Sequence, residues 1–303
     1  MYLYNIVVGI IFLSQIGVGV FGNSLFLCCY GFTLFSSHRS RPMEPLLVQL
    51  MLSNSMVLLS QGCQLVLFHL KKGYILGNAG CKMVFYLQRI GRGHSICTTC
   101  LLSAFQAITI SPSHSSLAKF KVRLLKFIRP SCLFCWIFNM IIEINVPIYI
   151  TESRSVNSSH GGRMDLLYCY RERALKELAL LPSFRDILFI GCMVFTSGYK
   201  VFLLYRHHQR VHHIHNTCLS PRTLPEIKAT QTILLLVGIF VIAYCISCGF
   251  TLYKVYMIHS GTWVVDVIPF IALCFPTISP FLFIHIYTQT SKACCAPWQR
   301  PYL

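Results

Sequence analysis

Long apolar segments recur along the whole 303-residue chain and limit what it can fold into. The clearest of them follows Arg92, because from Gly93 to Pro112 the sequence carries no charged residue. A helix of that length spans the roughly 30 Å hydrocarbon core of a bilayer. Hydrophobic residues make up 55% of the chain and charged residues only 12%, which leaves too little polar surface for a water-soluble globule. The chain is therefore predicted to be an integral membrane protein.

Seven apolar stretches are long enough to cross a membrane as helices. They predict an all-α membrane protein, a seven-transmembrane helix bundle, in a single domain that covers residues 1–303. The predicted spans are residues 3–35, 45–70, 82–111, 130–150, 183–205, 229–257 and 261–287, followed by a cytoplasmic tail, 288–303. The first span has no basic segment before it and no clear cleavage site, so we expect a retained signal anchor.

The basic residues predict which ends of the spans face the cytoplasm. The segments after the first, third and fifth spans carry Lys and Arg almost without acids, as between Ser113 and Arg129. By the positive-inside rule these segments are cytoplasmic, and the amino terminus is outside. The sequon at Asn157, after the fourth span, agrees because glycosylation occurs only on the lumenal side. The net charge of +17 therefore reflects membrane topology, and we expect contact with the lipid bilayer and no nucleic-acid partner.

Two of the 16 cysteines, Cys81 and Cys169, fall at polar boundaries that face outside. Disulfides persist on that oxidising side, so we predict a bridge between Cys81 and Cys169; two free boundary thiols are the alternative. Most other cysteines lie inside apolar spans, where a thiol behaves as a small hydrophobe. Three Cys-x-x-Cys pairs begin at Cys97, Cys132 and Cys245, and we interpret them as packing contacts rather than metal or redox sites.

Among the ionisable residues in the predicted spans, Arg89, Arg92 and Glu143 are the candidates for a functional site inside the membrane. The two arginines are one helical turn apart, about 12–16 Å below Cys81, and Glu143 is about 10 Å below the outer end of its span. Buried ionisable groups are costly and usually find partners or line a cavity. One interpretation is an ion pair of Arg89 or Arg92 with Glu143 at the base of an outward-facing ligand cavity. The alternative is that both arginines extend to the outer interface.

The sequence carries no set of residues typical of an enzyme. We find no Ser/His/Asp set, no glycine-rich phosphate loop and no paired carboxylates placed for catalysis, and we expect no cofactor. We interpret the histidines after the fifth span as a solvated cytoplasmic helix end rather than a metal site: His207, His208, His212, His213 and His215. The chain is therefore predicted not to be an enzyme.

Several stretches closely resemble the vomeronasal type 1 receptors, a family of seven-helix G protein-coupled receptors for pheromones. These stretches are CKMVFYLQRIGRGHSICTTCLLSAFQAITISP, PSCLFCWIFNMI, YRHHQRVHHIH, SPRTLPEIKATQTILLL and FPTISPFLF. The resemblance implies a rhodopsin-like bundle, a bridge between the extracellular Cys81 and Cys169, and glycosylation at Asn157. It also implies a small-molecule pheromone, a heterotrimeric G protein of the inhibitory type, and the plasma membrane of vomeronasal sensory neurons.

The common signatures of rhodopsin-like receptors are altered in this chain as they are in the family it resembles. The tripeptide FQA at 105–107 stands where Asp-Arg-Tyr would end the third span, and SP at 279–280 stands where Asn-Pro would lie. The expected cytoplasmic ion lock is therefore absent, so we assign no residues to G protein contact. Lys200 departs from the family pattern, as do Gln88 and His94, and we expect its amine to extend to the cytoplasmic interface.

Two other functions share part of this pattern. A bitter taste receptor of type 2 has the same architecture, but that family is not expected to hold the bridge between Cys81 and Cys169. A transporter or channel would explain charges inside the membrane, yet transporters usually show internal repeats and broken half-helices. The sequence therefore predicts a G protein-coupled pheromone receptor that binds a small chemosignal in a cavity between the outer halves of its helices.

Overall fold

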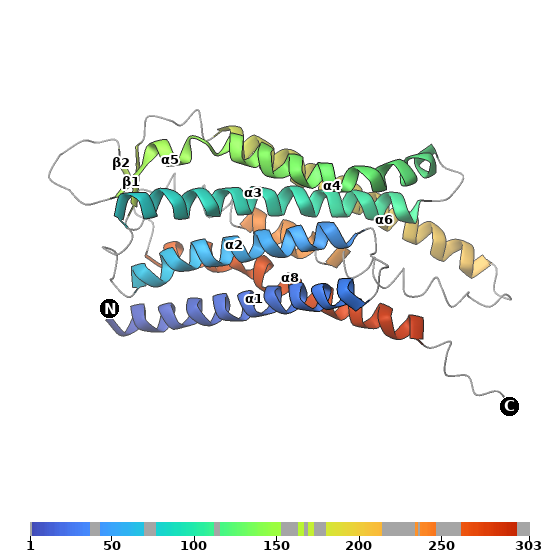
Figure 1. Cartoon of the computed structure of the whole chain (residues 1–303), viewed down its shortest axis with the longest axis horizontal. Helices are drawn as coiled ribbons and strands as arrows, with labels where there is room; N and C mark the ends of the chain where they lie inside the picture. Colours follow the sequence, from blue (N-terminus) through green and yellow to red (C-terminus); the bar gives the residue numbers. More distant parts are fainter. Residues whose placement is uncertain are drawn as a thin grey trace.

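The structure, a computed structural model, is a bundle of long helices that run side by side (Figure 1). It describes residues 2–36, 43–69, 77–111, 116–152, 163–166, 169–172, 180–213, 234–235, 237–246 and 262–295. The long helices are α1 (Tyr2–Ser36), α2 (Glu44–His69), α3 (Gly77–Ile110), α4 (Ser116–Ile142), α6 (Leu180–His213) and α8 (Thr262–Cys295). Each contains an apolar stretch long enough to cross a membrane, which confirms the predicted all-α membrane fold.

A shorter apolar helix, Val237–Ile246, lies in the sixth predicted span, residues 229–257. The remainder of that span is outside the described residues, apart from the helical pair 234–235. Helices are the structure that these segments must adopt, because a bilayer offers no water to hydrogen-bond the backbone and a helix satisfies its own amide groups.

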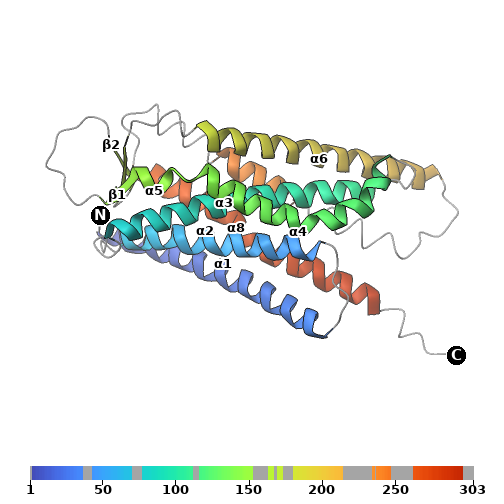
Figure 2. The same cartoon turned by 45° about the horizontal axis from the view of Figure 1, so that its top comes forward.

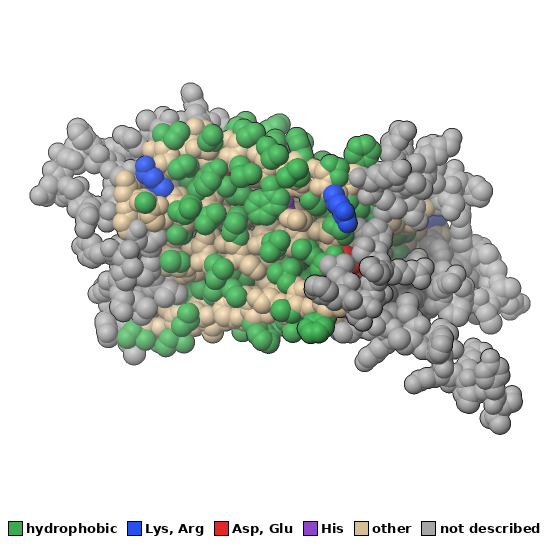
Figure 3. Space-filling model, viewed as in Figure 1, with side chains coloured by type: hydrophobic (Ala, Val, Ile, Leu, Met, Phe, Trp, Pro, Cys, Tyr) green, Lys and Arg blue, Asp and Glu red, His purple; other side chains and the backbone are tan. Residues whose placement is uncertain are grey.

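The surface of the bundle is apolar around its middle. Figure 3 shows hydrophobic side chains over the central part of one face, with the visible Lys and Arg side chains toward the two ends. Phe32 and Phe195 are 80% and 77% exposed, values that are unfavourable in water and natural against lipid chains. This surface indicates that the middle of the bundle faces the hydrocarbon core of a membrane.

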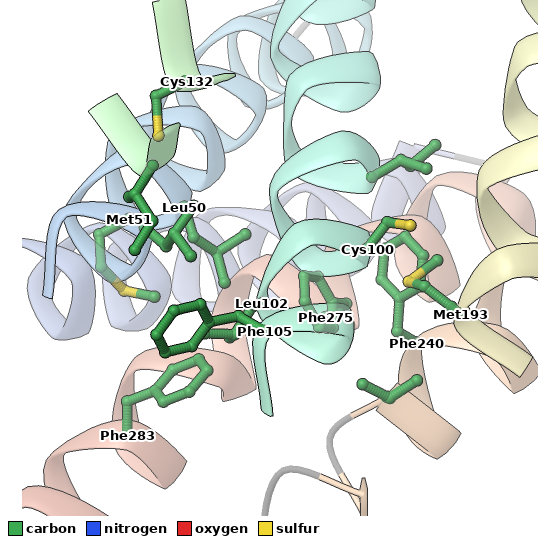
Figure 4. Close-up of a cluster of buried hydrophobic side chains, with 14 of the residues drawn as sticks. Leu50, Met51, Cys100, Leu102, Phe105, Cys132, Met193, Phe240, Phe275 and Phe283 are labelled. Carbon is green, nitrogen blue, oxygen red and sulfur yellow. The ribbon is translucent and has the colours of Figure 1, made fainter. Parts of the chain in front are cut away.

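The bundle is organised around α3, which contacts α2, α4 and α6 along its length. In Figure 2, α1 and α6 lie on opposite sides with α2, α3 and α4 between them. The main apolar cluster joins α3 to the helices around it (Figure 4): Phe26, Leu46, Leu50, Met51, Ile96, Cys100, Leu102, Phe105, Ile128, Cys132, Met193, Val237, Phe240, Phe275 and Phe283. The rings of Phe240 and Phe275 meet edge to face at 4.5 Å. In lipid, such packing holds helices together through van der Waals contact rather than through exclusion of water.

The helix of the fourth span differs from its predicted bounds at both ends, whereas the apolar span Phe127–Ile148 lies close to the predicted residues 130–150. The helix was expected to begin at Pro130, but α4 begins at Ser116 and contains Pro130, so the predicted basic loop is largely helical. Proline removes one backbone donor without ending a helix when the surroundings compensate for the lost bond. The span was also expected to run to Ile150, but the helix ends at Ile142 and a turn over Glu143–Asn145 leads into the single-turn helix α5 (Val146–Tyr149). The structure therefore places Glu143 at the outer end of α4.

A small antiparallel sheet, which the sequence did not predict, covers the outer end of the bundle. Its strands are β1 (Ile150–Glu152), β2 (Arg163–Leu166) and β3 (Cys169–Glu172), in the order β1-β3-β2. In the register, Cys169 of β3 faces Glu152 of β1 and Leu166 of β2. Because β1 also contacts α3, the sheet lies over the end of α3 that carries Cys81. The start of α1 lies at this same end of the bundle, whereas α8 ends at the opposite one (Figure 1).

Candidate functional site

Arg185 is the centre of a group of buried charged residues in the outer half of the bundle. It lies in the second turn of α6, and 3% of its side chain is exposed. Its Nη1 is 3.1 Å from Glu143 Oε1 and donates a hydrogen bond of 2.8 Å to Asn139 Oδ1. Its Nη2 is 2.8 Å from Oδ1 of the neighbouring Asp186. The guanidinium group therefore connects α6 to the outer end of α4.

Asp186 extends this group to two further elements. Its Oδ2 accepts a hydrogen bond of 2.7 Å from Tyr244 Oη, on the helix Val237–Ile246, and lies 4.0 Å from Arg92 Nη2 on α3. The guanidinium of Arg92 lies 4.9 Å from the centre of the Tyr244 ring, within the range of a cation–π contact. We name the residues Arg92, Glu143, Arg185 and Asp186 the outer charge cluster.

The outer charge cluster is balanced, with two cations and two anions. Removing an ion from water costs several kcal/mol, roughly, and close partners are needed to offset that cost. A planar guanidinium meets this need well because it can donate in several directions at once. Glu143, 2% exposed, therefore depends on Arg185 for its buried position, and Arg185 depends on both acids.

The predicted ion pair of Glu143 with Arg89 or Arg92 was wrong. Among the described residues Glu143 pairs with Arg185, and Arg92 approaches Asp186 instead. Arg89 lies one turn nearer the outer end of α3 and is half-buried. Arg185 and Asp186 lie inside the fifth predicted span, residues 183–205, but the sequence analysis did not consider them. Two adjacent opposite charges inside an apolar run were the signal that could have identified them.

Glycine is required beside the cluster. A Cβ atom on Gly93 would lie 2.6 Å from Arg185 Nη1 and still closer to Asn139 Oδ1. Real Cβ atoms essentially never approach other atoms so closely, so one of these partners would have to move. Gly93 thus lets α3 pack directly against the hydrogen bond between Arg185 and Asn139.

A polar layer follows one residue further along α3. His94 is fully buried, its Nδ1 lies 2.6 Å from Ser53 Oγ, and its ring stacks on Trp136 at 4.0 Å. The indole Nε1 of Trp136 donates to Gln49 Oε1 at 2.7 Å. These contacts join α2, α3 and α4 below the cluster.

Amide and hydroxyl groups connect α1, α2, α3 and α8 on the other side of α3. Asn54 donates to Ser279 Oγ and accepts from Ser95 Oγ, both at 2.9 Å. The amide of Asn23 donates to the carbonyl oxygen of Pro276 at 3.0 Å. These residues are buried, and their pairing satisfies polar groups that lipid could not.

Lys200 does not extend to the cytoplasmic interface as predicted. Its side chain is fully buried, and its Nζ donates to Ser103 Oγ at 2.9 Å and to Gln106 Oε1 at 3.2 Å. The prediction was wrong because it considered only the position of Lys200 along its helix. The direction of the side chain, toward α3, depends on how the two helices pack.

Cys81 is buried and disulfide-bonded, and it packs against Phe85 and Val146. The backbone of Cys169 lies in β3, but its side chain is outside the described part of the structure, as is Asn157. Pairing of Cys81 with Cys169 therefore stays a proposal. Cys97, Cys100, Cys132 and Cys135 are free and buried, in keeping with their interpretation as packing residues: two lie on α3 and two on α4.

Comparison with known proteins gives the family of the chain. The model of the vomeronasal organ pheromone receptor family matches residues 6–296. The chain belongs to this family. The receptor is 39% identical to vomeronasal type-1 receptor 1 of Homo sapiens over 290 residues, which cover 95% of this chain and 82% of that protein. It is 38% identical to vomeronasal type-1 receptor 4 of Homo sapiens over 299 residues, covering 97% and 98% of the two chains.

A relative from a rodent has a sequence identity close to that of the human relatives. Vomeronasal type-1 receptor 90 of Rattus norvegicus is 35% identical over 288 residues, which cover 93% of this chain and 91% of that one. The predicted family, the multi-pass membrane fold and the function as a G protein-coupled pheromone receptor are therefore confirmed for this vomeronasal receptor.

Proposed function

We propose that this vomeronasal receptor binds a small chemosignal in the outer half of its bundle and activates a heterotrimeric G protein of the inhibitory type. The observation that supports this mechanism is the position of Asp186, which meets Arg92 of α3, Arg185 of α6 and Tyr244 of the helix Val237–Ile246. A ligand that competes for one of these contacts changes how three helices pack. Such a change connects binding outside to activation inside.

Arg92 and Tyr244 are the proposed contacts of the ligand. Arg92 is the most accessible member of the outer charge cluster, with 41% of its side chain exposed, whereas Asp186 is 8% exposed. A polar group of the ligand would therefore meet Arg92 or Tyr244 Oη before the buried acids. Ligand sites are usually apolar with a few such polar groups, which fix the orientation of the ligand. We retain Arg89 as a further candidate at the outer side of the same helix.

The outer sheet is proposed to cover this site. A bridge from Cys81 to Cys169 would fix β3 to the outer end of α3, and the register of the sheet carries that constraint to β1. Ordering a loop at each binding event costs free energy, so a fixed cover favours binding. Glycosylation at Asn157, in the segment that joins β1 to β2, is part of the same proposal, as is residence in the plasma membrane of vomeronasal sensory neurons.

The family match favours a pheromone receptor over a bitter taste receptor of type 2. The structure gives less physical support to a transporter or channel, because two of the three intramembrane charges that motivated it, Arg92 and Glu143, belong to the balanced outer charge cluster. Membership of a receptor family also supports the expectation that the chain is not an enzyme.

The proposal is tested in cells that express the receptor, with G protein activation as the readout for a panel of small chemosignals. Tyr244→Phe removes the hydrogen bond to Asp186 and should raise ligand-independent activity. A hydrogen bond to a charged acceptor is worth about 1.5–3 kcal/mol, or roughly tenfold or more in the equilibrium between two packings. The matched control is Tyr205→Phe, at an exposed position of α6.

Two results would contradict the proposal. One is a Tyr244→Phe receptor that matches the wild type in ligand-independent activity and in response at equal surface expression. The other is a ligand-dependent ion current in vesicles that contain the receptor and no G protein, which would favour a channel.

A further inference from the structure

A buried lysine lies in the cytoplasmic half of the bundle, far from the outer charge cluster. Lys200 is on α6, about 22 Å along the helix axis from Arg185. Its two hydrogen bonds go to Ser103 and Gln106, and both of these acceptors are on α3. Lys200 is therefore a polar contact between α3 and α6 on the side where a G protein would bind.

No acid pairs with Lys200 in the part of the chain that the structure describes, where Glu143 and Asp186 pair within the outer charge cluster. The sequence gives the reason, because of its nine acidic residues only Glu44 and Glu226 fall in predicted cytoplasmic segments. The two acceptors are themselves neutral, and Ser103 Oγ is also bonded to Thr196 Oγ1 at 2.8 Å. The amine thus has dipoles around it but no counter-charge among the described residues.

Such a position is unfavourable for the packed helices. Moving an ammonium group out of water costs more free energy than a few hydrogen bonds to neutral groups regain. For this reason buried charges are usually paired. The buried amine therefore shifts the balance toward an arrangement that hydrates it.

We infer that Lys200 destabilises the packing of α3 against α6 and so sets how readily the cytoplasmic half of the receptor opens. The link from opening to signalling rests on the proposed function. Gln106 stands where rhodopsin-like receptors carry the arginine of Asp-Arg-Tyr, so the cation at this level comes from α6 instead of α3. Removing that cation should make the receptor more stable and less active without ligand.

The test compares the full-length receptor with its Lys200→Met variant, purified in detergent. Methionine is unbranched and similar in length, so it fills the same space without a charge. Thermal unfolding should shift upward by at least about 3 °C, because apolar replacement of buried charge is commonly stabilising. Ligand-free nucleotide exchange on an inhibitory G protein should fall several-fold. The control is Arg206→Met, which removes a cation from an exposed position of the same helix and should leave both values near the wild type.

The outcomes separate this inference from the proposed function. An unfolding midpoint for Lys200→Met at or below the wild-type value would overturn the inference, and a higher midpoint with equal or greater exchange would overturn its link to opening. If Lys200→Met does not accumulate, Lys200→Gln, which keeps a donor for Ser103, takes its place; failure of both also refutes the inference. If Lys200→Met raises the unfolding midpoint but the wild-type receptor causes no nucleotide exchange, Lys200 is still destabilising and coupling to the inhibitory G protein is rejected.

Discussion

Gly93→Ala is the substitution for which the structure predicts the largest effect from one added carbon atom. The new Cβ would lie 2.6 Å from Arg185 Nη1 and closer still to Asn139 Oδ1. Neither partner can withdraw freely, because Asn139 also donates to the carbonyl oxygen of Cys135 at 2.7 Å and Arg185 is held by two acids. The alanine therefore strains or separates the contacts that keep the outer charge cluster together.

The size of the effect follows from two opposing contributions to the free energy of unfolding. Breaking a buried ion pair costs about 3–5 kcal/mol. Alanine returns about 0.5–1 kcal/mol because it favours the helix more than glycine does. A net loss of about 2–4 kcal/mol corresponds to a fall of about 3–6 °C in the unfolding midpoint of a protein of this size.

The measurement is thermal unfolding of the purified receptor in detergent, followed by the loss of monodisperse protein after heating. Gly198→Ala is the matched control, because it adds the same atom to α6 at a position where, apart from the backbone of its own helix and its chain neighbours, no described atom lies within 4 Å. It should leave the midpoint unchanged or slightly higher. A Gly93→Ala receptor that unfolds within about 1 °C of the wild type would refute the close packing of α3 against Arg185 and Asn139.

Three further predictions concern the ion pair, the disulfide and the topology. Arg185→Glu should abolish surface expression, and Glu143→Arg in the same chain should restore part of it; absence of rescue, with each protein translated normally, would mean that the two residues do not pair. Cys81→Ser and Cys169→Ser should reduce ligand response about equally, each costing about 2–4 kcal/mol of stability, and the double variant should be no worse than either; additive damage would show that the thiols act separately. Asn157 should carry a glycan that enzymatic deglycosylation removes, whereas a sequon engineered at the cytoplasmic end of α4 should stay unmodified; a glycan there would reverse the orientation.

The sequence alone determined that this chain is a helical membrane protein, and it predicted which face of the membrane each segment meets. An uncharged run such as residues 93–112 has few structural options in a bilayer, because a helix satisfies all of its backbone hydrogen bonds within the run itself. The signal is local, since each span carries it in its own composition. The distribution of Lys and Arg between the spans is likewise visible without a structure.

The bounds of the fourth span show where local signals fail. Proline at position 130 suggested a helix start and the apolar run to Ile150 suggested a continuous helix, yet α4 passes through Pro130 and ends at Ile142. Whether a helix tolerates a missing hydrogen bond, or ends inside an apolar run, depends on the groups that surround it.

The tertiary structure alone decided which charges meet. The sequence indicated that Glu143 needed a cation inside the membrane, but several arginines satisfied that requirement, and the rotation and depth of α6 relative to α4 selected Arg185. The same rotation turned Lys200 toward α3 and away from the cytoplasmic interface. Sequence position fixes how deep a side chain lies along its own helix. The direction in which the side chain points depends on how the helix packs against all of its neighbours. That direction decides which polar groups pair inside a membrane.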